Sequence, residues 1–302
     1  YRFIENPVYD RDYGYRMTAN CECRDILKIK NLLLWDLSYR TDKFGRRFTE
    51  GKVSPKTDEF VVFYGGSRTF GQGVLDGETL ASNFQKLTPS KRVYNYGIIN
   101  SGANTFLKQH EDQKFKKEIP EKQGLFLYVF DLGHEQKILG TKYAVSSYAA
   151  PFYDYNDKHE LVYFGSFWMG RPFKSFILNL LSFSAVYQNI FLNYRPVISS
   201  LSAEDNKLVN AVILKMKKEV EAFGNSKFAV VFFETVGSAI LDDLSRSLSE
   251  AGVDVLYFDK SVLPANDNKN YYKYDRHPKA STYVVQAQLL QQELIKKSWL
   301  KK

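Results

Sequence analysis

The sequence predicts an α/β fold with a mostly parallel sheet of five strands. From residue 59 onward, continuously apolar runs alternate with segments of helical spacing, which is the order of elements typical of that class. The apolar runs show no polar alternation, as expected of strands that are buried on both faces. Three of the runs end in small or polar residues. In a parallel sheet those ends share one edge, where ligands bind.

The expected strands and helices follow one another in regular order. The strands are expected at 60–64, 92–96, 125–130, 228–233 and 253–258, and the helices at 77–87, 104–117, 206–223, 238–251 and 281–299. Pro89 and Pro120 stop the first two helices, because proline cannot continue a helix. Gly224 and Gly252 close the next two, and Ser202 is the expected N-cap of the third.

Two parts of the chain lie outside this alternation of strands and helices. Residues 1–57 are polar and aromatic, and we expect them to form an N-terminal extension of strands and loops packed on the core. Residues 58–302 then form the main domain, with an aromatic-rich insertion at about 140–200. Within the insertion, an Asn-Asp turn signal predicts a hairpin over 153–164. The apolar segment 175–194 is interrupted by polar residues, so we expect a buried core helix, or else a lid over the site.

The composition describes a globular chain. Of 302 residues, 44% are hydrophobic and 25% are charged, and the formal net charge is +8. Lys and Arg are dispersed and form no basic stripe, so nucleic acid is not an expected partner. The charge is compatible with a non-specific, peripheral association with an anionic envelope polymer or membrane surface. The 21 Tyr and 23 Phe suit a large core, and an aromatic-lined sugar or acyl site is the alternative.

The cysteines and the start of the chain are the features that could indicate the cellular compartment of the protein. Cys21 and Cys23 are expected to be unpaired, because residues two apart on a strand rarely meet disulfide geometry. The sequence has no apolar run of about 18 residues, so no transmembrane segment is expected in the chain shown. The chain begins at Tyr1 instead of Met, so the compartment stays open. A periplasmic or extracytoplasmic location, with a leader removed, is one expectation.

Ser67 is the candidate nucleophile, and His277 is its candidate base. Ser67 follows a Gly-Gly pair at the end of the first strand, so it is expected at the carboxyl edge of the sheet. A serine hydroxyl needs a histidine to take its proton and a carboxylate to orient that histidine. His277 lies two residues after Asp275, and in an extended loop two such side chains project the same way. His110 and His159 are expected to be solvated.

These segments resemble the sequence blocks of the SGNH/GDSL hydrolase superfamily. The nucleophile block of that family, usually Gly-Asp-Ser, corresponds to Gly65-Gly66-Ser67, and its second block to Gly97. Its last block, an Asp shortly before a His, corresponds to Asp275-Arg276-His277-Pro278. The resemblance covers roughly residues 58–295. It implies a flavodoxin-like three-layer α/β/α sandwich, a catalytic triad of Ser67, His277 and Asp275, and no metal or organic cofactor.

Two positions depart from the family pattern. Gly66 stands where the family has an aspartate, and the third strand ends in Asp131-Leu132-Gly133-His134 without the usual oxyanion-binding asparagine. We expect His134 to replace that amide, beside the backbone N–H groups of Ser67 and Gly97. A purely structural His134 is the alternative, and Asn100 is a second candidate for the same role.

The expected function is a serine-dependent ester hydrolase or O-acyltransferase that acts on a small acyl ester. The resemblance to this family implies that the substrate is an O-acetyl group on a glycan or envelope molecule. Two alternatives stay open. One is a non-catalytic binding module that retains the fold, and the other is a lipase-like esterase for longer acyl chains. The residues do not identify the acyl group, the acceptor or the oligomeric state.

Overall fold

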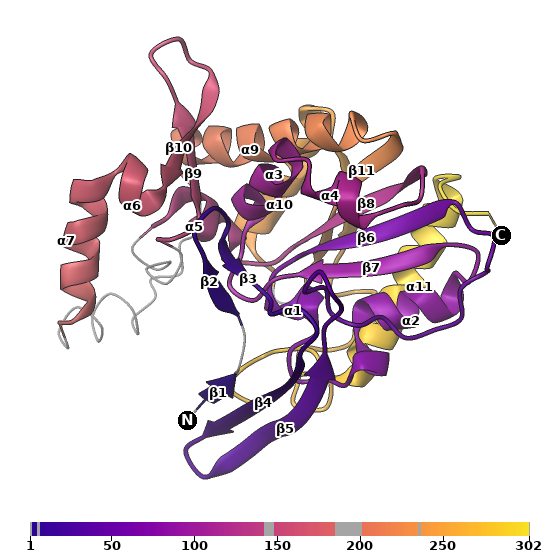
Figure 1. The fold of residues 1–302 in the computed structure, drawn as a ribbon. Coiled ribbons are helices and arrows are strands. Elements are labelled where there is room, and N and C mark those ends of the chain that lie inside the picture. Colours follow the sequence, from indigo (N-terminus) through magenta and orange to yellow (C-terminus); the bar gives the residue numbers. More distant parts are fainter. Residues whose placement is uncertain (1, 5–6, 142–147, 185–200, 235–236, 302) are drawn as a thin grey trace.

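A five-stranded, wholly parallel sheet forms the centre of the molecule (Figure 1). The computed structural model describes residues 2–4, 7–141, 148–184, 201–234 and 237–301. The strand order is β12–β11–β8–β6–β7, with bounds β6 Glu59–Gly65, β7 Arg92–Gly97, β8 Gln123–Phe130, β11 Asn225–Phe233 and β12 Asp254–Phe258. Counted along the chain this order is 2-1-3-4-5, the flavodoxin-like arrangement. The predicted fold class is therefore confirmed.

Helices cover both faces of this sheet. The bounds are α2 Leu80–Leu87, α3 Ala103–Glu111, α9 Ala203–Glu221, α10 Ala239–Glu250 and α11 Ala280–Lys296. One core lies between the sheet and α3, α9 and α10, and it includes Tyr64 and Phe232. A second core lies between the sheet and α2 and α11, and it includes Phe63 and Val231. Successive residues of a strand point to opposite faces, so each strand supplies both cores and reads as a continuous apolar run.

Short helices follow several strands, and one expected helix is divided. The additional elements are α1 Ser67–Phe70, the 3₁₀ helix η1 Asp76–Glu78, α4 Lys114–Glu118 and α5 His134–Leu139. The helix expected over 104–117 is instead split into α3 and α4. Gln113 between them has a φ of 55°, a left-handed conformation that interrupts a right-handed helix. The predicted cap of α9 is confirmed, because the Ser202 hydroxyl accepts a hydrogen bond from the Asp205 N–H at 3.0 Å.

The insertion contains the predicted hairpin and an exposed helix. Strands β9 (Pro151–Tyr155) and β10 (Leu161–Ser166) are antiparallel, and they lead into α6 (Phe167–Gly170) and α7 (Pro172–Ser182). The expectation of a buried helix over 175–194 is wrong for the part that α7 covers, and residues 185–194 lie outside the described residues. α7 packs on a small local cluster instead of a main core, and most of its apolar side chains are exposed. Within the described ranges, no helix combines the length and apolarity needed to cross a bilayer.

The N-terminal residues form two small antiparallel sheets that contact the core through Arg47. Strands β1 (Arg2–Ile4), β4 (Glu22–Ile29) and β5 (Leu32–Arg40) form one sheet, and β2 (Val8–Asp10) and β3 (Gly14–Arg16) form the other. The buried Arg47 guanidinium donates to Asp76 Oδ1 at 2.8 Å and to the Val74 carbonyl at 2.8 Å. These bonds tie the segment after β5 to the loop after α1. The division into 1–57 and 58–302 stays a prediction.

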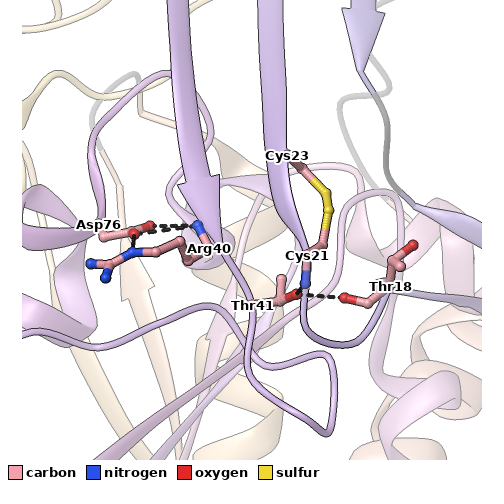
Figure 2. The surroundings of a disulfide bond; sticks show 6 residues. All are labelled: Thr18, Cys21, Cys23, Arg40, Thr41 and Asp76. Carbon is pink, nitrogen blue, oxygen red and sulfur yellow. Dashed lines mark hydrogen bonds and ion pairs between the residues drawn. A yellow bond between two sulfur atoms is a disulfide. The ribbon is translucent and has the colours of Figure 1, made fainter.

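Cys21 and Cys23 form a disulfide bond, so the expectation of unpaired cysteines is wrong (Figure 2). Their Cα atoms are 5.4 Å apart, within the range that a disulfide bridges. The prediction assumed that both residues lie on a regular strand, but Cys21 precedes β4. It is instead held by Thr41: the Cys21 N–H donates to Thr41 Oγ1 at 3.0 Å, and the Thr41 N–H donates to the Cys21 carbonyl at 2.9 Å (Figure 2).

Candidate active site

Ser67 is the first residue of α1, directly after strand β6. The turn between strand and helix has no room for a side chain at Gly66, because a Cβ there would lie 2.7 Å from His134 Nε2. Gly97, at the end of the neighbouring strand β7, is equally crowded, since a Cβ there would lie 2.3 Å from the Phe70 nitrogen. Glycine at both positions therefore lets α1 lie close against the sheet edge, with Ser67 at its start.

The structure brings Ser67, His277 and Asp275 together. His277 Nε2 lies 2.8 Å from Ser67 Oγ, although 210 residues separate the two in the chain. On the other side of the ring, His277 Nδ1 hydrogen-bonds to Asp275 Oδ1, and the His277 backbone N–H donates to the same oxygen at 3.3 Å. All three expected residues thus form one chain of hydrogen bonds from carboxylate to imidazole to hydroxyl.

Asp275 and His277 meet through a compact turn and not through the extended loop that we expected. Tyr274 and Arg276, on either side of Asp275, have φ values of 70° and 66°, in the left-handed region that side chains rarely adopt. Hydrogen bonds from the Arg276 N–H to the Tyr272 carbonyl (2.9 Å) and from the Tyr272 N–H to the His277 carbonyl (3.0 Å) hold the turn. Backbone strain of this kind concentrates at functional sites.

Aromatic side chains fix this turn against the segment that carries Ser67. The Tyr272 hydroxyl donates to the Gly73 carbonyl at 2.7 Å, and the Tyr283 hydroxyl donates to the Arg68 carbonyl at 2.7 Å. Trp35, from the N-terminal strand β5, packs edge-on against His277 with ring centroids 6.0 Å apart. The sequence does not reveal this tryptophan as a site residue, because it lies in an ordinary stretch of strand far from the family blocks.

His134 is buried beside the nucleophile turn. Its ring is 2% exposed, Nδ1 accepts from the Asp131 N–H at 3.3 Å, and the same nitrogen lies 2.9 Å from the Tyr128 hydroxyl. Burial lowers the pKa of His134 well below its ordinary value, so the ring is neutral at pH 7. With Nδ1 accepting, the proton is assigned to Nε2, which borders Gly66. The ring thus occupies the space that a side chain at position 66 would need.

Charged side chains line the same side of the nucleophile turn. Lys137, one turn after His134, places Nζ 3.7 Å from the position of a Cβ on Gly66. Burial lowers the pKa of Lys137 to about 8, although Asp131 and Glu135 favour its charged form. Arg68 Nη1 lies 3.6 Å from Asp131 Oδ1. Sequence reasoning missed Lys137, and its spacing of three residues from His134 on one helix was the available signal.

Gly97, whose N–H was expected to face the oxyanion, has that N–H hydrogen-bonded within the fold. Its N–H donates to Asn95 Oδ1 at 2.9 Å, and the Asn95 amide donates to the Thr69 carbonyl at 3.0 Å. The N–H is therefore already paired, and the glycine serves the close packing of α1. Gly102, the N-cap of α3, lies nearer the histidine, since a Cβ there would be 3.6 Å from the His134 carbonyl oxygen and 3.1 Å from Lys137 Cβ.

The two histidines that were expected to be solvated differ from each other. His159 is exposed in the turn of the β9–β10 hairpin, as predicted. The prediction for His110 is wrong, because its side chain is buried and its Nε2 lies 2.8 Å from the Tyr64 hydroxyl. Burial lowers the pKa of His110 to about 3. A helix that reads as polar therefore buries a neutral histidine in the core between α3 and the sheet.

No protein-family model and no curated protein sequence matches this chain. Among solved structures, a putative lipolytic protein of the G-D-S-L family from Desulfitobacterium hafniense is 13% identical, with a TM-score of 0.41, over 78% of this chain and 99% of that chain. An acetylxylan esterase from Geobacillus stearothermophilus, solved as a catalytic mutant, is 11% identical, with a TM-score of 0.38, over 79% of this chain and 94% of that chain.

A salicylyl-acyltransferase from a tetracycline biosynthetic pathway is 8% identical, with a TM-score of 0.35, over 93% of this chain and 71% of that chain. All of these likenesses are distant.

Proposed function

We propose that the protein is a serine-dependent ester hydrolase or O-acyltransferase of the SGNH/GDSL type. The observation that carries the proposal is the 2.8 Å contact between His277 Nε2 and Ser67 Oγ, with the other ring nitrogen on Asp275. A nucleophile within hydrogen-bond reach of a base that a third group orients is the arrangement that activates a serine. The alternative of a non-catalytic binding module gives no reason for these three contacts to coexist.

The proposed reaction proceeds in two steps. Ser67 Oγ attacks the ester carbonyl while His277 Nε2 takes the serine proton, and Asp275 stabilises the imidazolium that forms. The tetrahedral intermediate collapses, the ester C–O bond breaks, and His277 returns the proton to the leaving alcohol. Water or an acceptor hydroxyl then attacks the acyl-enzyme with His277 again as the base, which releases the acid or the new ester and restores Ser67.

The negative oxygen of the intermediate needs preorganised donors. We assign this role to the backbone N–H of Ser67 and to His134 Nε2, whose proton borders Gly66. Gly97 is left out because its N–H is paired with Asn95. Removal of one such donor typically lowers turnover by about 10²–10³-fold.

The substrate that we propose is a small acyl ester on a polar molecule, with O-acetyl on a glycan or envelope molecule as the leading case. The charged groups of Arg68, Asp131 and Lys137 lie beside the nucleophile turn. Such groups can hydrogen-bond a hydroxylated acceptor, whereas a long acyl chain would remove water from them without offering hydrogen bonds in exchange. These contacts therefore favour a short-chain esterase over a lipase-like enzyme.

The test is turnover of p-nitrophenyl esters from acetate to palmitate by the wild type and by Ser67→Ala. We expect the wild type to hydrolyse acetate and butyrate much faster than palmitate, and Ser67→Ala to lose this activity by at least about 10³-fold. Ser90→Ala is the matched control, because Ser90 is an exposed serine between α2 and β7. Its activity should equal that of the wild type.

Equal rates in wild type and Ser67→Ala would refute the nucleophile assignment and leave the binding-module reading. A maximum rate with palmitate would support the lipase-like alternative. Hydrolysis and transfer are separated by adding a sugar or glycerol acceptor and measuring the ratio of acylated acceptor to free acid. For an acyltransferase, the ratio of acylated acceptor to free acid should be well above the molar ratio of acceptor to water.

A further inference from the structure

Helix α7 presents an apolar stripe to solvent. Five large side chains lie along one face of this 11-residue helix and are between 37% and 79% exposed: Phe173, Phe176, Ile177, Leu180 and Leu181. Their spacing of i, i+3, i+4, i+7 and i+8 defines a single stripe, the pattern by which a helix normally faces a protein core. Here that face points outward. Contiguous apolar surface of this kind marks a binding surface.

The orientation of α7 is fixed by contacts on its other face. The buried Ser175 hydroxyl donates to the Phe167 carbonyl at 2.7 Å, and Leu178 packs on the local cluster that includes Phe152 and Phe167. At the start of the helix, the Arg171 guanidinium donates to the carbonyls of Leu139 and Gly140 at the end of α5. Turning the stripe inward would break these bonds, so its exposure is built into the packing.

The composition around α7 matches an anionic lipid surface. Residues 161–184 contain no Asp or Glu. Of their two cations, Lys174 is exposed, whereas the Arg171 guanidinium is engaged with the end of α5. Trp168, which is exposed in the short helix α6 just before α7, is a residue type that favours the headgroup level of a bilayer. A Lys or Arg close to an anionic membrane strengthens binding by about 1 kcal/mol. The chain as a whole carries a formal charge of +8.

The size of the stripe argues against a protein partner as its occupant. An α-helix of this length is about 16 Å long and about 10 Å wide, so one face covers only a few hundred Å². A stable protein interface buries about 800 Å² on each partner. Lipid, in contrast, deforms around a short helix, and an amphipathic helix lies in the interface with its apolar face at the acyl boundary.

We propose that α7 is a membrane-surface docking element, which lies in the interface of an anionic phospholipid bilayer with Phe173, Phe176 and Leu180 among its acyl chains. α6 and α7 project from the body next to α5, the helix that carries His134 (Figure 1). Docking through α7 therefore places the carboxyl edge of the sheet near the membrane. The proposal does not depend on the esterase function, because binding can be measured on the Ser67→Ala protein.

The test is co-sedimentation of the full chain with vesicles of phosphatidylcholine, with and without phosphatidylglycerol. We expect binding to vesicles that contain phosphatidylglycerol, weakening as salt increases, and at least about tenfold weaker binding to pure phosphatidylcholine. The triple variant Phe173→Gln, Phe176→Gln, Leu180→Gln should bind the anionic vesicles at least about 100-fold more weakly, since three large apolar contacts are lost. Glutamine keeps the helix propensity of the segment.

The matched control replaces three equally exposed apolar residues elsewhere: Tyr9→Gln, Leu33→Gln and Val262→Gln. This control should bind vesicles like the wild type, and circular dichroism should show that both triple variants are folded. Equal binding by the wild type and the α7 variant, or no binding by the wild type, would overturn the proposal. Wild-type dimers that the α7 substitutions dissociate, without vesicle binding, would assign the stripe to a second copy and would also overturn it.

Discussion

At the scale of single residues, Gly66 and His134 act as a pair. A Cβ at position 66 would lie 2.7 Å from His134 Nε2, so an aspartate there and this histidine cannot both keep their present positions. The glycine at position 66 and the histidine at position 134 therefore depend on each other for space. The ring is buried and neutral with Nδ1 accepting, and its Nε2 lies beside Gly66 and 3.9 Å from Asp131 Oδ2.

The first prediction concerns His134. His134→Leu removes the Nε2 donor, so kcat for p-nitrophenyl acetate should fall by about 10²–10³-fold with little change in KM. His134→Gln retains an N–H donor of similar reach and should stay within about tenfold of the wild type. Both variants should still be labelled at Ser67 by a fluorophosphonate, which shows that the nucleophile is intact. A purely structural histidine would instead give equal losses in both variants, accompanied by loss of stability.

At the scale of elements, the segment after β5 holds the loop that follows the nucleophile helix. Arg47 is fully buried and hydrogen-bonds Asp76 Oδ1, while its guanidinium stacks over the Tyr39 and Phe70 rings at 4.7 and 4.8 Å. Arg40 binds the other oxygen of the same carboxylate at 2.9 Å, from a side chain that is about half exposed. The two arginines thus bind the same Asp76 carboxylate, Arg47 from the protein interior and Arg40 from the surface.

The second prediction compares these two arginines. Arg47→Met removes hydrogen bonds to Asp76 Oδ1 and to two backbone carbonyls, and it leaves the buried Asp76 carboxylate with the half-exposed Arg40 as its charged partner, so unfolding should become easier by about 3–5 kcal/mol. Arg40→Met, the matched control on the same carboxylate, should cost about 1 kcal/mol or less, because exposed ion pairs contribute little. Urea unfolding of the three proteins measures both values. Similar losses in the two variants would contradict the role assigned to the buried guanidinium.

At the scale of the whole molecule, two buried neutral histidines link stability to pH. Burial lowers the pKa of His110 to about 3 and that of His134 well below its ordinary value. An unfolded histidine takes up a proton below about pH 6.5, whereas folded His110 does so only near pH 3. Protonation therefore favours the unfolded chain between these values. The stability contribution is complete above about pH 6.5 and is lost as the pH falls toward 3.

The third prediction isolates this effect for His110. Between pH 7 and pH 5 the wild type should lose about 2 kcal/mol of unfolding free energy through this one residue. His110→Gln can still hydrogen-bond the Tyr64 hydroxyl but does not titrate, so its stability should fall less by about that amount. Urea unfolding at pH 7 and pH 5 gives the difference. His159→Gln, at an exposed site, should follow the wild type, and an identical slope in His110→Gln would contradict the prediction.

The sequence by itself determined the sheet, the main helices and the candidate triad. Apolar runs such as 125–130 identify buried parallel strands, because only a strand covered on both faces is apolar at every position. Ser67 and the pair Asp275 and His277 could be found because each lies in a short local pattern at the end of an element. Such patterns depend on local backbone conformation and on burial, which neighbouring residues largely set.

Only the tertiary structure decided which groups complete the site and which surfaces are left uncovered. Trp35 reaches His277, and Lys137 reaches Gly66, through contacts between elements that are distant in sequence or that meet across a turn. The pairing of Gly97 with Asn95 and the outward face of α7 depend on how elements pack on one another. A periodic pattern shows that a helix has an apolar face, but the crossovers and contacts of the folded chain decide whether protein or solvent covers that face.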